Sequence, residues 1–203
     1  MKVFISSTWE DLVEYRACVL EGIDRLRHQG EDVQWLGMEA FSAVDQTPLD
    51  ECLGFVNQAD VYVGILGVRY GSKPPGSDIS FTEAEFRRAT ERKIPRLLFL
   101  IDEENARVRP ADFEHDPESL ARLQELKKEI KQIRGVNSFK SPEDLEARVL
   151  TALQPHLRTA IPSSARLPAP SDLRASRSLD SPVFRRGSLG FRCVVVPQGS
   201  PKK

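Results

Sequence analysis

Two glutamates in one short helix-forming segment are the residues best suited to catalysis. Glu83 and Glu85 follow a loop rich in glycine and proline and precede an apolar segment. A carboxylate in that position can stabilise a developing positive charge or accept a proton. It can equally cap the helix, because Ser80 precedes Glu83 by three residues and Thr82 precedes Glu85 by three. Catalysis and capping are therefore both open for this pair.

The two capping registers exclude each other. If Ser80 caps the helix, Glu83 is the structural partner and Glu85 is left for chemistry. Residues two apart on a helix point in directions about 200° apart, so only one of the glutamates can face a given crevice. Glu85 is therefore the first candidate for a catalytic group, with Glu83 as the alternative.

Three hydroxyl residues, Ser6, Ser7 and Thr8, follow the first apolar run and lead into a helical pattern. Hydroxyls and backbone N–H groups at a helix start are suited to phosphate or ribose oxygens. The alternative is that Ser7 or Thr8 simply caps this helix.

Further candidate substrate-binding residues lie in loops after later strands. Arg69 can pair with a phosphate and Tyr70 can stack on a base, although a solvated loop arginine is an equal alternative. Asp45 lies in the loop 39–47, which either closes over a ligand or only connects two elements. Ser80 completes the set of candidate substrate-binding residues, beside its possible role as a cap.

Strand and helix patterns alternate along residues 1–160. The expected strands are 3–5, 33–38, 61–66 and 97–101, with a weak fifth at 136–139; helices are expected at 12–26, from 48, at 81–89, at 117–134 and from 142. This order predicts an α/β fold, a flavodoxin-like three-layer sandwich around a central parallel sheet of four to five strands. Ligands bind at the carboxyl edge of such a sheet, where the polar candidates fall.

Composition narrows the class of protein. The chain has 203 residues and a net charge of -1, which favours neither nucleic-acid nor membrane binding. No apolar run spans a bilayer and no signal-peptide pattern begins the chain, so a cytoplasmic protein is expected. Its three cysteines and three histidines lack metal-ligand spacing. Neither a phosphate-binding G-x-x-x-x-G-K-[ST] loop nor a G-x-G-x-x-G turn is present, and we expect no metal and no required cofactor.

The composition changes near residue 160. Residues 161–172 are rich in proline and serine and are expected to form a linker, and 173–203 are too short to bury a core of their own. The first 160 residues are therefore expected to form a single domain.

Three motifs in sequence, at 3–12, 59–71 and 80–86, resemble the DUF4062 family, and the resemblance covers about residues 1–155. This family is described as TIR-like. It usually lies at the N-terminus of multidomain proteins with NTPase, repeat or enzyme modules, many of them in bacterial signalling or defence. The resemblance implies a TIR-like fold and partners that are either further copies of the domain or such modules.

TIR domains that cleave NAD use a glutamate in a Glu-Leu-x-x-Ala-like context, and Glu85 to Ala89 resembles it. The tryptophan-cysteine part of that motif is replaced by Phe81 and Thr82. The resemblance implies NAD, or a related nucleotide, as substrate and Glu85 as the catalytic group. The competing hypothesis is a non-catalytic assembly module whose glutamates are caps.

The last 30 or so residues carry a second resemblance. Residues 187–194, with Gly-Phe-Arg at 190–192, are similar to the end of formylglycine-generating-enzyme (sulfatase-modifying-factor) domains. The body of that domain is absent, so 173–203 are expected to be a poorly ordered remnant. Cys193 inherits no catalytic role from this resemblance.

Overall fold

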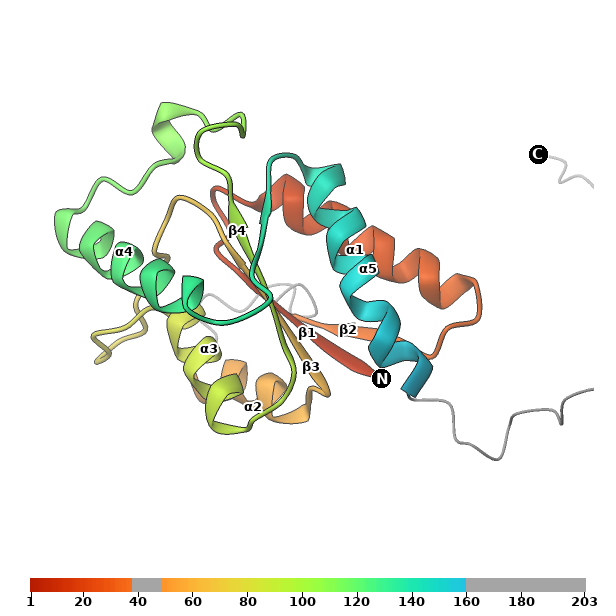
Figure 1. The fold of residues 1–203 in the computed structure, drawn as a ribbon. Coiled ribbons are helices and arrows are strands. Elements are labelled where there is room, and N and C mark those ends of the chain that lie inside the picture. Colours follow the sequence, from red (N-terminus) through yellow and green to blue (C-terminus); the bar gives the residue numbers. More distant parts are fainter. Residues whose placement is uncertain (38–48, 160–203) are drawn as a thin grey trace, which may run out of the picture. The chain divides into compact units, whose positions relative to one another are not determined.

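The computed structural model describes residues 1–37 and 49–159 (Figure 1). Its sheet has five strands in the order β2-β1-β3-β4-β5, and every pairing is parallel. The strands are β1 (Lys2–Ser7), β2 (Gln34–Leu36), β3 (Val61–Leu66), β4 (Arg96–Ile101) and β5 (Asn137–Phe139). This order is the flavodoxin-like doubly wound arrangement, in which the strand order along the sheet reverses at the β1–β3 pair.

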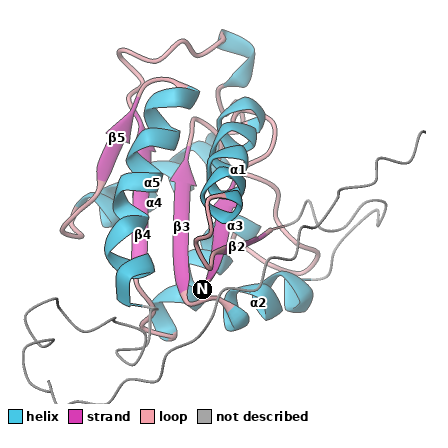
Figure 2. Cartoon of the chain, turned by 90° about the vertical axis from the view of Figure 1, so that its right-hand side faces the viewer, coloured by secondary structure: helices cyan, strands magenta, loops and turns pink. Residues whose placement is uncertain are grey.

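Helices cover both faces of the sheet (Figures 1 and 2). They are α1 (Val13–His28), α2 (Leu49–Gln58), α3 (Phe81–Glu91), α4 (Pro117–Lys131) and α5 (Pro142–Thr159), with a short 3-10 helix η2 (Pro110–Asp112). Residues of α1 and α5 bury one face, and residues of α2, α3 and α4 bury the other. The predicted α/β sandwich with a parallel sheet of four to five strands is confirmed.

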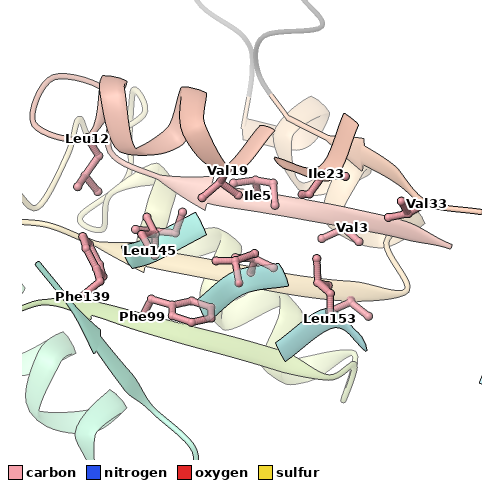
Figure 3. Close-up of a cluster of buried hydrophobic side chains, with 14 of the residues drawn as sticks. Val3, Ile5, Leu12, Val19, Ile23, Val33, Phe99, Phe139, Leu145 and Leu153 are labelled. Carbon is pink, nitrogen blue, oxygen red and sulfur yellow. The ribbon is translucent and has the colours of Figure 1, made fainter. Parts of the chain in front are cut away.

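Alternation along β1 assigns its side chains to the two faces. Val3 and Ile5 join the core beneath α1 and α5, together with Phe99 of β4 (Figure 3). Phe4, one residue out of step, belongs to the core beneath α2 and α3. Each such fully buried side chain contributes roughly 1.5–3 kcal/mol to folding. Ser6 has the same parity as Phe4, so it points toward α2 and α3.

The start of α1 differs from the expectation. Ser6 and Ser7 are the last residues of β1, paired in register with Gly64 and Ile65 of β3. The helix begins at Val13, after a turn, and its N-cap position has no side-chain cap. The alternative in which Ser7 or Thr8 caps this helix is therefore wrong, because the strand continues two residues beyond the apolar run.

The remaining boundaries agree within a few residues. The third helix begins after Ser80, whose side chain accepts the cap hydrogen bond from the Glu83 N–H, as the first capping register predicted. Asp45, the loop 39–47, the linker 161–172 and the segment 173–203 lie outside the described residues. In the described part, no helix is both long and apolar enough to span a bilayer.

Candidate active site

Glu85 contacts the carboxyl end of β1. The Ser6 hydroxyl donates a hydrogen bond to Glu85 Oε2 at 2.5 Å. Both side chains are nearly inaccessible, with Ser6 1% and Glu85 5% exposed. The two residues are 79 positions apart in the sequence. They meet because the side chain of Ser6 points from β1 toward the face of the sheet that α3 covers. It places a carboxylate at the edge where α/β folds bind ligands.

Tyr62 of β3 is a third member of this cluster, and sequence reasoning placed it only in an apolar strand. It is 0% exposed and stacks on Phe4 with ring centroids 6.1 Å apart. Burial raises the pKa of its phenol, and the negative charge of Glu85 raises it further, while a side-chain hydrogen bond with Ser6 acts in the opposite direction. The phenol therefore stays protonated beside the glutamate. A tyrosine inside an otherwise apolar central strand was the available signal.

Glu83 belongs to a different network. Its carboxylate accepts a hydrogen bond from the Tyr70 hydroxyl at 2.6 Å and forms an ion pair with Arg87 at 3.0 Å. The same Tyr70 hydroxyl accepts from the Ser80 N–H at 3.3 Å. Glu83 is therefore linked to the helix start through Tyr70, where the sequence predicted a direct bond to the cap residue. These contacts bind the loop after β3 to α3.

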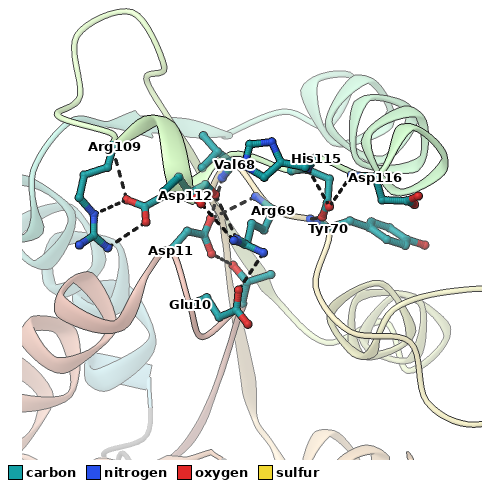
Figure 4. A network of polar contacts seen from close by, with 12 residues as sticks. Glu10, Asp11, Val68, Arg69, Tyr70, Arg109, Asp112, His115 and Asp116 are labelled. Atoms are coloured by element: carbon teal, nitrogen blue, oxygen red, sulfur yellow. Dashed lines mark hydrogen bonds and ion pairs between the residues drawn. The ribbon is translucent and has the colours of Figure 1, made fainter.

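Asp11 joins the turn after β1 to the loop after β3 (Figure 4). One carboxylate oxygen accepts from the Thr8 hydroxyl at 2.5 Å, and the other accepts from the backbone N–H groups of Val68 and Arg69 at 2.7 and 3.1 Å. Burial is the main cause that raises the pKa of this carboxyl, and the hydrogen bonds oppose it. The chain's own carboxylate thus lies where the sequence suggested that a ligand's anion would bind.

Arg69 is directed away from Glu85 as well. Its guanidinium forms an ion pair with Glu10 at 2.8 Å and donates to the carbonyl oxygens of Ala111 and Asp112 at 3.1 Å each (Figure 4). It therefore fastens η2 to the loops after β1 and β3. Ser7 accepts from Arg16 at 3.1 Å, and this arginine, 4% exposed on α1, also donates to the carbonyl of Ile5.

The predicted site residues fall into three groups. Ser6 lies with Glu85; Tyr70 and Ser80 lie with Glu83; Thr8 and Arg69 lie with Asp11. Ser7 faces Arg16 on the α1 side, opposite to Ser6. The sequence placed all of these at one sheet edge, but alternation along β1 and the turn after β3 separate their side chains.

A small cleft opens beside the third group. Its volume is about 180 Å³, and it lies between the start of α1 and the loop after β4, with Tyr15, Ile101 and Val108 among its apolar lining residues and Glu14 and Arg107 among its charged ones. Among the described residues, no cluster of histidine, cysteine and acidic side chains has the arrangement of a metal site. Cys52 is buried on α2, and burial raises its thiol pKa to about 11, so it is a poor nucleophile at neutral pH.

The sequence profile described as "Domain of unknown function (DUF4062)" matches residues 2–154. The chain belongs to the DUF4062 family. Over an alignment of 89 positions, the chain is 30% identical to telomerase protein component 1 of Rattus norvegicus and, equally, of Mus musculus. The alignment covers 39% of this chain and 3% of the length of those proteins.

Two solved structures are similar to this DUF4062 domain at a TM-score of 0.46. One is the TIR domains of the activated Roq1 resistosome directly recognizing the pathogen effector XopQ, with 12% identity over 75% of this chain and 98% of that chain. The other is a probable GTP-binding protein engB, with 13% identity over 78% of this chain and 99% of that chain.

The chemistry open to the DUF4062 domain centres on Glu85. A carboxylate screened from water and held by a hydroxyl interacts more strongly with a nearby cation than it would in solvent. Glu83 is already engaged by an arginine and a phenol. Of the two sequence candidates, Glu85 is therefore the better suited to meet a positively charged transition state.

Proposed function

We propose that this domain cleaves the N-glycosidic bond of NAD or a related nucleotide, with Glu85 as its catalytic carboxylate. The observation that supports this proposal is the contact between Glu85 and Ser6, which holds a 5% exposed carboxylate at the carboxyl end of β1. The resemblance of residues 85–89 to the glutamate motif of NAD-cleaving TIR domains points to the same side chain.

The reaction needs one carboxylate. As the bond between the ribose C1′ and the nicotinamide nitrogen breaks, its electron pair neutralises the pyridinium, so the leaving group requires no proton. The ribose becomes oxocarbenium-like and positively charged, and Glu85 stabilises that charge. Water then adds to C1′ and loses a proton to solvent, giving nicotinamide and ADP-ribose. Ser6 holds Oε2 in place, which limits the reorganisation needed during the reaction.

The same proposal gives the domain a role in signalling or defence. Members of such families usually precede NTPase or repeat modules, so those modules or further copies of the domain would control the reaction. A domain that consumes a common nucleotide must be restrained until a partner assembles it. Activity should therefore depend on protein concentration.

An exposed apolar pair favours a second candidate function, that of a non-catalytic assembly module. Trp9 is 60% and Val13 42% exposed, and they lie four residues apart where β1 leads into α1. An exposed tryptophan is a common anchor in protein interfaces. In this candidate function Glu85 serves only to connect α3 to β1.

The test measures nicotinamide release from NAD by concentrated protein, for wild type, Glu85→Gln, Glu83→Gln and Glu91→Gln. The exposed Glu91 on the same helix is the matched control, and its variant should equal wild type. We expect Glu85→Gln to lose at least about 100-fold in rate, because the amide keeps the shape and removes the charge. Glu83→Gln should keep its activity per folded molecule.

Two results would change the assignment. Activity of Glu85→Gln within twofold of wild type would exclude Glu85 as the catalytic carboxylate. Absence of release by any variant, in protein shown to be assembled, would favour the assembly module. In that case Trp9→Ser should dissociate the assemblies while leaving the thermal midpoint close to wild type.

A further inference from the structure

The backbone N–H groups that follow β3 are bound by carboxylates of the chain itself. Val68 and Arg69 donate to one oxygen of Asp11 at 2.7 and 3.1 Å (Figure 4). The next N–H group, that of Tyr70, donates to Glu114 at 3.2 Å. Successive N–H groups beyond the carboxyl end of a parallel strand are the kind of group that binds a substrate phosphate in α/β folds. In this domain an internal anion holds each of the three.

Asp11 fits this position closely. A Cβ atom on Gly67 would lie 2.1 Å from the same Asp11 oxygen, so the carboxylate packs directly on the backbone of the loop. The Thr8 hydroxyl donates to its other oxygen at 2.5 Å. A phosphate oxygen finds no space between this carboxylate and the loop. The negative charge of Asp11 is therefore a fixed part of this edge of the sheet.

The cations of this region are engaged as well. Arg107 and Arg109 line the cleft between α1 and the loop after β4, and the lining of that cleft includes no residue of α3. The sequence of 38–48 contains Glu39 and Asp45 and no lysine or arginine. Within the described residues, each lysine or arginine of the loop 67–80 and of α3 pairs with a carboxylate of the chain: Arg69 with Glu10, Lys73 with Glu118, Arg87 with Glu83 and Arg88 with Glu91.

Asp11 lies close to the proposed catalytic carboxylate. Ser6 donates to Glu85, and Thr8 donates to Asp11. These two hydroxyl residues are two positions apart, and two residues span at most about 7 Å even when fully extended. The anchors of both carboxylates are therefore neighbours at the end of β1.

The side chain of Thr8 also lies on the α3 side of this edge. A Cβ atom on Gly71 would lie 3.0 Å from the Thr8 methyl group and 3.6 Å from the hydroxyl oxygen of Thr82, which precedes Glu85 by three residues on α3. Charges at such separations are only partly screened, because the Debye length is about 8 Å at physiological ionic strength. A substrate bound at Glu85 is therefore within range of the charge on Asp11, which attracts a cationic ring and repels a phosphate.

We propose that this site recognises the positively charged N-riboside part of its substrate and selects against a phosphate on the same ribose, with Asp11 as the residue that sets this specificity. The inference rests on the proposed function and names its substrate class: N-ribosides of a cationic base without a phosphate, such as nicotinamide riboside. During hydrolysis the bond from C1′ to the ring nitrogen breaks and its electron pair goes to the nitrogen. Water adds to C1′ and releases a proton to solvent, giving nicotinamide and ribose.

The experiment measures nicotinamide release by the full chain from nicotinamide riboside, nicotinamide mononucleotide and NAD. The first two differ only in the phosphate. We expect kcat/KM for the riboside to exceed that for the mononucleotide at least about tenfold, since only the mononucleotide brings an anion to Asp11. NAD, which carries a diphosphate on the same ribose, should also fall below the riboside.

Asp11→Asn tests the residue that sets the preference. The amide oxygen still accepts from the loop N–H groups, but the charge is gone, so the ratio of the two kcat/KM values should fall toward one, mainly through faster cleavage of the mononucleotide. Asp60→Asn is the matched control. Asp60 also accepts from a backbone N–H, that of Lys2 at 2.7 Å, but it lies at the opposite edge of the sheet, where β3 begins. Its ratio should stay within twofold of wild type.

Three results would overturn the proposal. One is a mononucleotide or NAD cleaved as fast as the riboside. Another is an Asp11→Asn ratio equal to that of wild type, and a third is an equal change in Asp60→Asn. Should Asp11→Asn fail to fold, salt replaces it: raising NaCl from about 0.05 to about 0.5 M should narrow the wild-type ratio. A ratio that does not respond to salt would then overturn the proposal.

Calorimetric binding separates this proposal from the proposed function. Tighter binding of nicotinamide riboside than of the mononucleotide, with no release from either, would keep the recognition and contradict the enzyme. Release that favours the mononucleotide would keep the enzyme and overturn the recognition. If neither compound binds and neither is cleaved, both proposals are overturned.

Discussion

Removing the Tyr70 hydroxyl should lower the stability of this domain substantially while leaving the shape of the side chain almost unchanged. Tyr70 is 1% exposed, and its hydroxyl connects the buried carboxylate of Glu83 to the N–H of Ser80 at the start of α3. In Tyr70→Phe the ring stays and both contacts are lost. The loop after β3 and the first turn of α3 then lose their shared atom.

The size of the effect follows from the two contacts. A hydrogen bond to a charged group contributes about 1.5–3 kcal/mol, and a buried N–H without an acceptor costs at least about 1 kcal/mol. The Ser80 contact is long at 3.3 Å, so we take the lower figure for it. Together they predict a loss of about 3 kcal/mol in the free energy of unfolding. For a domain of this size, that corresponds to a fall in Tm of roughly 6–12 °C.

Urea and thermal unfolding of wild type and Tyr70→Phe measure this loss. Tyr15→Phe is the control, because its ring packs on Phe139 at 5.4 Å while no hydrogen bond to its hydroxyl is found within the described residues. That variant should stay within about 0.5 kcal/mol of wild type. A Tyr70→Phe domain as stable as Tyr15→Phe would refute the view that Glu83 is a structural carboxylate.

Two further predictions concern stability. In Gly67→Ala, the new methyl group overlaps the Asp11 carboxylate, so the free energy of unfolding measured in urea should fall by roughly 1–3 kcal/mol. Gly54→Ala on α2 is the control. Its new methyl group meets no atom within 4 Å beyond its chain neighbours and the local helix backbone, so this variant should be neutral or stabilising. Equal effects of the two would contradict the role of Asp11. Burial raises the pKa of Tyr70 to about 12, above the value of about 10 in an unfolded chain. The contribution of the protonated phenol to stability is therefore complete below pH 10 and is lost as the pH rises toward 12. A free energy of unfolding that does not fall between about pH 9 and pH 11 would contradict this prediction.

Much of the fold could be predicted from short-range patterns. The apolar run 61–66 indicated a strand, and β3 occupies those residues in the middle of the sheet. Ser80 three residues before Glu83 indicated the start of α3, and Ser80 is its cap. Signals of this kind depend on neighbours in the sequence, so they can be recognised without the tertiary structure.

The partners of the polar side chains could not be predicted in this way. Asp11, for example, binds backbone N–H groups 57 and 58 residues away. The end of β1 was placed too early, because Ser6 and Ser7 have no strand preference of their own and are held by their pairing with β3. Because the strand was ended before Ser6, the sequence did not predict that Ser6 and Ser7 point to opposite faces of the sheet, where Ser6 contacts Glu85 and Ser7 contacts Arg16. Tyr62 was missed because its neighbours come from another strand: its ring stacks on Phe4 of β1.

The central claim is that the Glu85 carboxylate itself promotes bond cleavage, and chemical rescue tests it most directly. Glu85→Ala removes the carboxylate and leaves space into which formate fits, so formate can take its place. We predict that formate raises the rate of nicotinamide release by Glu85→Ala at least about tenfold, as expected for a restored catalytic carboxylate. It should leave wild type and Glu83→Ala unchanged. A folded Glu85→Ala domain that binds NAD but shows no response to formate would contradict the claim.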